Sequence, residues 1–288
     1  MIKWGTTFGS HDGALAVFVD DELVFASDAE RWSRKKNDSI IPDNLIEFAE
    51  NKWGVPEIVY FYEDLDLKDE RRKFAGQKLR YKHKFKYPVV YCNHHKSHAR
   101  YGYYTSPFDD CTVLVIDAIG EWDTLTQWKV TDGNFKQVNN WRYPRSIGLF
   151  YSAMTQAAGW KPNEEEYILM GASAVVQEYD NKDYQYIKSM WDDDENFHKG
   201  IDIEGITDKF EIAAIAQDIY EGVLRRIIHY IDDENLVFVG GCALNVSANR
   251  YLFKYNTFIP CNPGDGGSAI GCALDHKIEA NPYLGYEI

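Results

Sequence analysis

The chain has 288 residues, of which 45% are hydrophobic and 26% charged, an ordinary globular composition that excludes wholesale disorder. Lys and Arg number 31 against 45 Asp and Glu, and the resulting net charge of −14 argues against a general binder of nucleic acid or of anionic membranes. No apolar run approaches the roughly 18 residues of a membrane span, and no secretion signal is visible. The five cysteines are widely spaced, which fits buried thiols of a reduced compartment better than disulfides. We therefore expect a soluble cytoplasmic protein.

The first half of the chain predicts a three-stranded meander followed by a helix and two more strands. Runs rich in β-branched and aromatic residues alternate with turns rich in glycine and aspartate, which is the pattern of short paired strands. The predicted strands cover residues 3–8, 14–19, 23–27, 57–62 and 88–92, and the predicted helix covers residues 43–53.

A second unit of the same strand pattern begins after residue 110. It closes in a hairpin whose turn, Thr131-Asp132-Gly133-Asn134, suits two antiparallel strands. The duplication predicts an α/β fold of two lobes, lobe I over residues 1–110 and lobe II over residues 111–288. The predicted strands of this second unit cover residues 112–116, 124–130 and 135–142.

A long helix is predicted after this second unit. Thr207 is its expected N-cap, and apolar residues keep a helical period from Phe210 to Ile231. A buried strand over residues 236–239 then leads into the pair Gly240-Gly241. Because no linker rich in Pro or Ser interrupts the chain, we expect two lobes of one fold rather than independent modules.

Three histidines lie within five positions at residues 94–98. If a helix starts here, His94 and His98 lie one turn apart on the same face, which is the spacing with which two imidazoles bind one metal. A polar surface turn or a pair of hydrogen-bonded histidines is the alternative. Asp117, at the end of a predicted strand, and Asp265, in a glycine-rich loop, strengthen the metal interpretation. Such a set suits Fe(II), Mn(II) or Zn(II) acting as a Lewis acid, with iron our first expectation.

Glycine-rich turns follow three predicted strands, at residues 9–13, 240–241 and 262–267. Each could present backbone N–H groups to a phosphate, although none is a Walker A loop or a dinucleotide fingerprint, and each alone is more often a mere turn. Together, on a duplicated frame, they indicate a nucleotide cleft between the lobes.

Basic residues are concentrated in one segment, residues 68–86, where nine of nineteen are Lys or Arg with aromatic residues between them. One interpretation is a solvated charged surface. The other is a docking surface for a polyanion, such as a nucleotide or DNA acceptor, or for an acidic partner.

Eight short motifs occur in the order seen in one family, and together they span most of the chain. They are HDGA at 11–14, ERWSRKK at 30–36, HHKSHA at 94–99, VIDAIGEW at 115–122, SIGLFYS at 146–152, EYILMG at 166–171, GGCALN at 240–245 and PGDGG at 263–267. The chain thereby resembles the nodulation and antibiotic O-carbamoyltransferases, such as the tobramycin and cephamycin enzymes.

This resemblance implies the duplicated actin/hexokinase/Hsp70-like (ribonuclease H-like) α/β fold, with a nucleotide and metal cleft between two lobes. It implies a divalent metal at His94, His98, Asp117 and Asp265, with carbamoyl-adenylate beside it, formed from carbamoyl phosphate and ATP. The residues expected to bind this cofactor are Gly120, Glu121, Gly240, Gly241, Asn245, Gly264 and Gly266.

The resulting hypothesis is a metal-dependent transfer of the carbamoyl group to an acceptor hydroxyl. Lys36 would neutralise the phosphate of the leaving AMP, and either His11 or His95 would serve as the general base. Two alternatives remain open at this stage. One is a kinase or ATPase of the same fold, which does not need paired histidines, and the other is a non-catalytic nucleotide-binding subunit.

The chain departs from the family pattern in three places. Asn37 stands where the family usually has His, and Ile168 stands where it usually has Lys. Family members continue into a second domain that makes carbamoyl-adenylate, whereas this sequence stops at residues 282–288, so we expect a separate adenylate-forming protein to dock at residues 68–86 or 283–288. No motif specifies the acceptor. The basic, aromatic segment favours a nucleotide or a hydroxymethylated base in DNA over a small neutral molecule.

Overall fold

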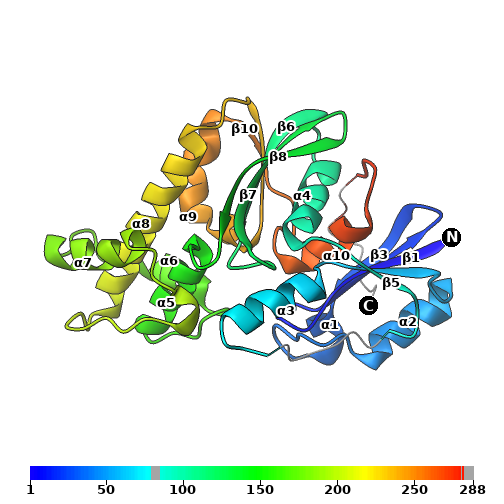
Figure 1. The fold of residues 1–288 in the computed structure, drawn as a ribbon, viewed down its shortest axis with the longest axis horizontal. Helices are drawn as coiled ribbons and strands as arrows, with labels where there is room; N and C mark the ends of the chain where they lie inside the picture. The colour runs from blue at the N-terminus through cyan, green and yellow to red at the C-terminus, as the bar shows by residue number, and fades with distance from the viewer. Residues whose placement is uncertain (79–84, 280, 282–288) are drawn as a thin grey trace.

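The computed structural model describes residues 1–78, 85–279 and 281, and it places two five-stranded sheets in two lobes (Figure 1). Both sheets have the same topology: three antiparallel strands form a meander, and two further strands run parallel to the first. The duplication predicted from the sequence is therefore confirmed. The order of the first sheet is β3 (Glu22–Asp28), β2 (Ala14–Val19), β1 (Ile2–Thr7), β4 (Ile58–Phe61), β5 (Val89–Tyr91), and that of the second is β10 (Asn256–Phe258), β9 (Asn235–Val239), β6 (Asp110–Ile116), β7 (Asp123–Thr131), β8 (Asn134–Arg142).

Helices cover the sheets and fill the region between them. The predicted helix over residues 43–53 has the bounds of α2, but Thr207 is not the N-cap of the long helix, because the Asp208 carboxylate accepts the hydrogen bond from the Phe210 N–H at 2.8 Å. The helices are α1 (Ala29–Ser33), α2 (Asp43–Trp53), α3 (Leu65–Phe74), α4 (His94–Thr105), α5 (Ile147–Ala157), α6 (Glu166–Ala172), α7 (Asn181–Asp192), α8 (Lys209–His229), α9 (Val246–Asn249) and α10 (Asp265–Ala273), with short 3-10 turns at Phe197–Lys199 (η1), Gly241–Leu244 (η2) and Arg250–Lys254 (η3).

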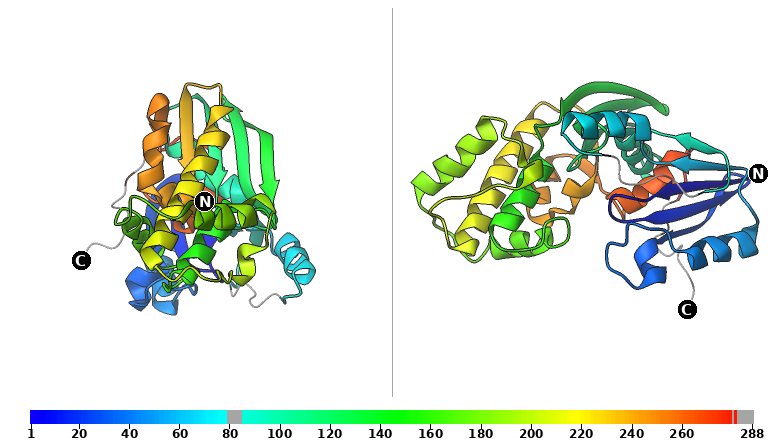
Figure 2. Two further views of the ribbon diagram at one scale, coloured as in Figure 1. Left: turned by 90° about the vertical axis from the view of Figure 1, so that its left-hand side faces the viewer. Right: turned by 60° about the horizontal axis from the view of Figure 1, so that its bottom comes forward.

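Each lobe has its own core. In lobe I, Trp4 and Phe61 from the sheet pack with Leu45 of α2, and all three side chains are fully buried. In lobe II, the buried face of α8 packs with α5 and the sheet around Phe150 and Phe238. Burying a large apolar side chain contributes about 1.5–3 kcal/mol. Figure 2 shows the two lobes side by side, with α5, α6, α7 and α8 gathered at the outer end of lobe II.

Helix α10 lies across the division of the chain at residue 110. Helix α10 belongs to residues 111–288, yet it packs against β1, β2 and β4 of lobe I and against α4 (Figure 1). Its sequence, DGGSAIGCA, is nearly all small residues, so its backbone approaches its neighbours closely. A Cβ at Gly5 of β1 would lie 1.9 Å from the Ala269 carbonyl oxygen, so only glycine fits there. The last helix therefore ties the two lobes together.

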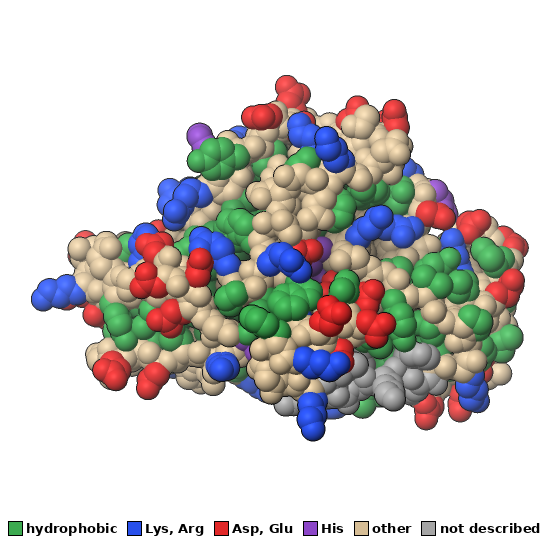
Figure 3. Space-filling view, viewed as in Figure 1, with side chains coloured by type: hydrophobic (Ala, Val, Ile, Leu, Met, Phe, Trp, Pro, Cys, Tyr) green, Lys and Arg blue, Asp and Glu red, His purple; other side chains and the backbone are tan. Residues whose placement is uncertain are grey.

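Within the described ranges no helix is long and apolar enough to cross a bilayer. Acidic and basic side chains are intermingled over the face shown in Figure 3.

Candidate metal and nucleotide site

Three elements from distant parts of the sequence deliver four ligand-type side chains to the junction of the lobes. Helix α4 starts at His94 because the Asn93 side chain caps it, accepting from the Lys96 N–H at 2.8 Å, so His94 and His98 lie one turn apart as predicted. Asp117 follows directly after β6, and Asp265 is the first residue of α10.

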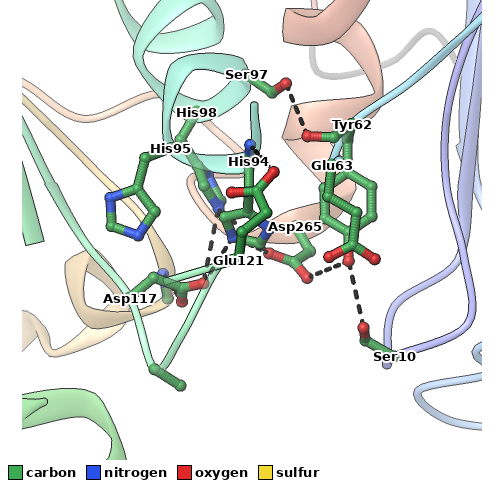
Figure 4. A network of polar contacts seen from close by, with 12 residues as sticks. Ser10, Tyr62, Glu63, His94, His95, Ser97, His98, Asp117, Glu121 and Asp265 are labelled. Carbon is green, nitrogen blue, oxygen red and sulfur yellow. Dashed lines mark hydrogen bonds and ion pairs between the residues drawn. The ribbon is translucent and has the colours of Figure 1, made fainter. Parts of the chain in front are cut away.

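The four side chains converge on one point (Figure 4). His94 Nε2 lies 2.9 Å from Asp117 Oδ2 and 3.5 Å from Asp265 Oδ1, and His98 Nε2 lies 3.2 Å from both His94 Nε2 and Asp265 Oδ1. One ligand atom from each residue can be chosen so that all four lie within 4.8 Å of one another, and all four residues are buried. Asp265 Oδ1 accepts no hydrogen bond from the described residues.

The carboxylates and imidazoles of this cluster shift one another's pKa. Burial by itself lowers the pKa of His94, but Asp265 and Asp117 outweigh it and raise that pKa to about 9. Burial by itself raises the pKa of both carboxyl groups, yet His94 and His98 lower that of Asp265 to about 2, and His94 holds that of Asp117 well below its usual range. Two buried carboxylates thus depend on imidazole protons for their stability. Two imidazole nitrogens and two carboxylate oxygens are also a suitable donor set for Fe(II), Mn(II) or Zn(II), so the residues fit the expected metal.

Neighbouring groups fix the orientation of the ligands. The Gly241 N–H donates to Asp117 Oδ1 at 3.0 Å, and the Tyr62 hydroxyl donates to Asp265 Oδ2 at 3.3 Å. Hydrogen bonds to the oxygens of metal-binding carboxylates are the usual means of holding such ligands in place.

Glu121, a predicted cofactor contact, binds backbone groups at the starts of two helices. Its buried carboxylate accepts hydrogen bonds from the backbone N–H groups of His94, at 2.9 Å, and Asp64, at 2.7 Å. It thus anchors the first turn of α4 and the N-cap of α3. It lines neither of the two cavities described next. We assign it the positioning of the His94 backbone.

Two cavities meet at the cluster. The first, of about 290 Å³, is lined by Tyr151, Tyr167 and Tyr220, and we call it the tyrosine-lined cavity. The second, of about 310 Å³, is lined by Arg71, Arg72 and His198, and we call it the arginine-lined cavity. The residues that line both are His11, Asp117, Ala118, Ser152, Asn163 and Asp265. A ligand in either cavity would therefore lie beside Asp117 and Asp265, two of the four candidate metal ligands.

The predicted cofactor-binding residues divide into two groups. Gly241, Asn245 and Gly264 line the tyrosine-lined cavity, whereas the other glycines have structural reasons to be glycine. Gly240 has a φ of 93°, and a Cβ there would lie 2.2 Å from the Ile116 carbonyl oxygen.

Two further glycines of that set also serve packing. A Cβ at Gly120 would lie 3.1 Å from the His94 side chain, and a Cβ at Gly266 would lie 2.5 Å from Asp28 Oδ1. Neither glycine lines the two cavities at the cluster. They permit close packing around the cluster.

The predicted catalytic residues lie in three different environments. His11 lines both cavities, and its Nδ1 lies 2.9 Å from Asp12 Oδ2. Burial lowers the pKa of His11, but Asp12, Asp265 and Asp117 raise it to about 10. Lys36 is exposed, with its Nζ 5.3 Å from the centre of the Tyr167 ring.

His95 points away from the cluster (Figure 4). Its side chain is fully buried, its Nδ1 lies 3.0 Å from Thr126 Oγ1, and burial together with the charge of His94 holds its pKa well below the ordinary value. It lines neither cavity. Of the two predicted general bases, His11 is therefore the one that lines a cavity.

The basic segment is divided between the interior and the surface. Lys68 and Arg71 are 4% and 3% exposed, and Lys68 pairs with the buried Glu63, whereas Lys73, Lys78 and Lys86 are exposed. A solvated surface is therefore the wrong interpretation for Lys68 and Arg71 only. Residues 79–84, as well as 283–288 at the chain's end, lie outside the described residues.

Several residues in the cavity walls or directly behind them carry no prediction from the sequence. Ser152 donates to Glu166 Oε1 at 2.6 Å at the edge of the tyrosine-lined cavity, and Gln217 exchanges hydrogen bonds with Asn245. Ser152 and Glu166 belong to the motifs SIGLFYS and EYILMG, which could have pointed to them. Gln217 lies inside the amphipathic helix α8, where no motif indicates a polar contact.

Two relatives match nearly the whole chain in sequence. The chain is 30% identical to an uncharacterised protein of Methanocaldococcus jannaschii, over 96% of this chain and 59% of that protein. It is 24% identical to the 3'-hydroxymethylcephem-O-carbamoyltransferase of Amycolatopsis lactamdurans, over 92% of this chain and 58% of that enzyme. The chain therefore spans less than two thirds of the length of these relatives.

Solved structures share the fold. The activator of the 2-hydroxyisocaproyl-CoA dehydratase from Clostridium difficile, with bound ADPNP, matches with a TM-score of 0.55 and 16% identity, over 95% of this chain and 93% of the activator. Full-length HypF in its phosphate- and nucleotide-bound form matches with a TM-score of 0.50 and 13% identity, over 94% of this chain and 45% of HypF. The actin/hexokinase/Hsp70-like fold is thereby confirmed. Residues 61–274 match the family described as carbamoyltransferase N-terminus, and the chain belongs to that family.

Proposed function

We propose that this chain carries out the transfer step of an O-carbamoyltransferase, moving a carbamoyl group from carbamoyl-adenylate to an acceptor hydroxyl at a divalent metal, with iron as the first candidate. One observation carries the proposal: four buried metal-ligand side chains lie where two separate cavities meet. A transferase needs a donor and an acceptor on either side of its reacting centre. A nucleotide kinase needs no paired histidines.

The tyrosine-lined cavity suits the adenylate. Tyr151, Tyr167 and Met170 offer apolar surface for a flat base, while Gly241 and Gly264 leave room for the ligand beside backbone. The activator and HypF structures, which share this fold, hold nucleotides, and this supports the assignment. Lys36, beside Tyr167, is placed to approach the phosphate side of such a ligand from solvent.

In the transfer step the acceptor oxygen forms a bond to the carbamoyl carbon, and the bond from that carbon to the phosphate oxygen breaks. AMP leaves with the electron pair, and the hydroxyl proton passes to a base, so the products are a carbamate ester, AMP and one proton. A metal held by His94, His98, Asp117 and Asp265 would polarise the carbamoyl carbonyl, which nitrogen donation otherwise makes a poor electrophile.

His11 is the candidate for receiving the proton. It lines both cavities, and the Asp12 carboxylate both orients its ring and stabilises the protonated form. Burial lowers the pKa of His11, but Asp12, Asp265 and Asp117 outweigh this effect and raise the pKa. Neutralisation of Asp117 and Asp265 would bring that pKa back towards its ordinary range, where imidazole is an effective base.

The test is product mass spectrometry with the metal-loaded chain, carbamoyl-adenylate and a panel of hydroxyl acceptors. The donor is supplied either directly or through ATP, carbamoyl phosphate and an added adenylate-forming protein. We expect a carbamate ester from the wild type and from His229→Ala, an exposed histidine of α8, and none from His94→Ala. Mg²⁺-dependent ATP hydrolysis that is unaffected by His94→Ala, without a carbamoylated product, would instead favour a kinase or ATPase.

A further inference from the structure

The arginine-lined cavity differs in chemistry from the tyrosine-lined cavity. It lies between the lobes, with α3 contributing Lys68, Arg71 and Arg72 on one side and η1 contributing His198 on the other. Its volume of about 310 Å³ is at the lower end of the range for small-molecule sites. If the nucleotide occupies the tyrosine-lined cavity, this second cavity is the one left for the acceptor.

The charges lining this cavity are unbalanced in favour of cations. Among the described residues, the acidic ones that line it are Asp117 and Asp265, whose carboxylates belong to the His/Asp cluster. Lys68 is paired with the buried Glu63 behind it, at 2.5 Å. Arg71 donates through Nε to the Glu121 carbonyl oxygen at 2.9 Å, and Arg72 adds a second guanidinium group to the lining. After burial, the charges of these two groups contribute to lowering the pKa of His198.

Two nitrogen atoms of the cavity lining lack hydrogen-bond partners within the described ranges. Arg72 donates through Nη1 to the Lys78 carbonyl oxygen at 3.3 Å, but its Nε is buried and has no acceptor. The Nδ1 atom of His198 is likewise buried without a partner. A buried donor without an acceptor, such as the Arg72 Nε–H group, is costly by about 1–3 kcal/mol, and a bound ligand with several acceptor oxygens would remove that cost.

We propose that the acceptor hydroxyl compound carries a phosphate group, and that Arg72, with Arg71 and His198, binds this phosphate in the arginine-lined cavity. This inference rests on the proposed function and deepens it, because it names the chemical class of the acceptor. A phosphate monoester offers the planar guanidinium groups several acceptor oxygens, which favours paired, charge-assisted hydrogen bonds. Held there, the far end of the molecule would place its hydroxyl at the shared wall of the two cavities, beside His11.

The experiment measures binding rather than turnover. Ribose 5-phosphate, ribose and inorganic phosphate are titrated calorimetrically into the metal-loaded protein. The variants are Arg72→Gln, Arg72→Lys, and Arg226→Gln as a matched control on the exposed face of α8. We expect ribose 5-phosphate to bind at least about tenfold more tightly than ribose, since hydrogen bonds to charged groups are worth roughly a factor of ten or more. Arg72→Gln should remove that advantage, Arg72→Lys should keep part of it, and Arg226→Gln should keep all of it.

A His94→Ala/His98→Ala variant separates this inference from the proposed function. Binding of ribose 5-phosphate that survives in this variant, yet is lost in Arg72→Gln, supports the phosphate site even if no carbamoyl transfer is found. Equal affinity for ribose and ribose 5-phosphate, or wild-type affinity in a folded Arg72→Gln, overturns it. Binding of inorganic phosphate but not of ribose 5-phosphate also overturns it, because the cavity would then take free phosphate or carbamoyl phosphate. Should Arg72→Gln fail to fold, His198→Asn takes its place, with the same expected loss.

Discussion

Replacing Gly271 with Ala should destabilise the protein, because this glycine lies where α10 crosses α4. A Cβ at position 271 would lie 2.0 Å from the Ser97 carbonyl oxygen and 2.8 Å from both the backbone nitrogen and the Cβ of Tyr101. These are atoms of a helix backbone or close to it, so they cannot rotate away as the end of a flexible side chain can, and the two helices must move apart. Overpacking of this kind costs typically 1–3 kcal/mol, and we expect about 3 kcal/mol here. Separation of the helices would also separate His98 from Asp265.

The matched control is Gly222→Ala in the middle of α8, where the nearest atom, Arg225 Nη2, is 4.0 Å away. Alanine there should raise the free energy of unfolding by about 0.5–1 kcal/mol, because glycine is a poor helix former. Thermal unfolding should therefore show a melting temperature lower by about 5–10 °C for Gly271→Ala and slightly higher for Gly222→Ala. A Gly271→Ala protein as stable as Gly222→Ala, with its full metal content, would refute the close packing of α10 on α4.

Three further predictions concern the site. His11→Asn should lower kcat by about a hundredfold or more while metal content stays the same, measured by single-turnover carbamoyl transfer, since general bases contribute roughly 10²–10⁴-fold; an unchanged kcat would exclude His11 as the base. Gly241→Val should weaken AMP binding in calorimetry, because a Cβ there would lie 2.9 Å from Asp117 Oδ1 at the wall of the tyrosine-lined cavity, and unchanged affinity in a folded variant would place the nucleotide elsewhere. Lys68→Met should lower the free energy of unfolding in guanidinium by about 3–5 kcal/mol, because it removes the ammonium group that lies 2.5 Å from the buried Glu63 carboxylate. A loss below about 1 kcal/mol would show that this ion pair contributes little to stability.

Local patterns were sufficient to predict the framework of the fold. The meander strands, the bounds of α2 and the i,i+4 pair of His94 and His98 all follow from short-range periodicity, which survives in the folded protein because each element buries one face. Asp117 and Asp265 were also predictable, since each follows directly on a strand or a glycine-rich turn. The structure brings these four residues together as the sequence analysis expected.

Contacts between distant segments were not predictable. The sequence of α10 shows that it is made of small residues, but nothing local says that these pack on β1, some 260 residues earlier in the chain. The direction of His95 depends on the rotation of α4, which turns it about 100° away from His94 and towards β7. Both interpretations of the basic segment, a solvated surface and a docking surface, assumed exposed side chains, whereas pairing with Glu63 allows Lys68 to be buried.

The most direct test of the metal centre is the metal content of the purified protein. Elemental analysis by mass spectrometry would be carried out on the wild type, on a His94→Ala/His98→Ala variant and on His229→Ala as the control, with circular dichroism to verify folding. We predict one divalent ion for each chain in the wild type and in His229→Ala, and none in the double variant. A folded double variant that keeps its full metal content would contradict the assignment of His94, His98, Asp117 and Asp265 as the ligands.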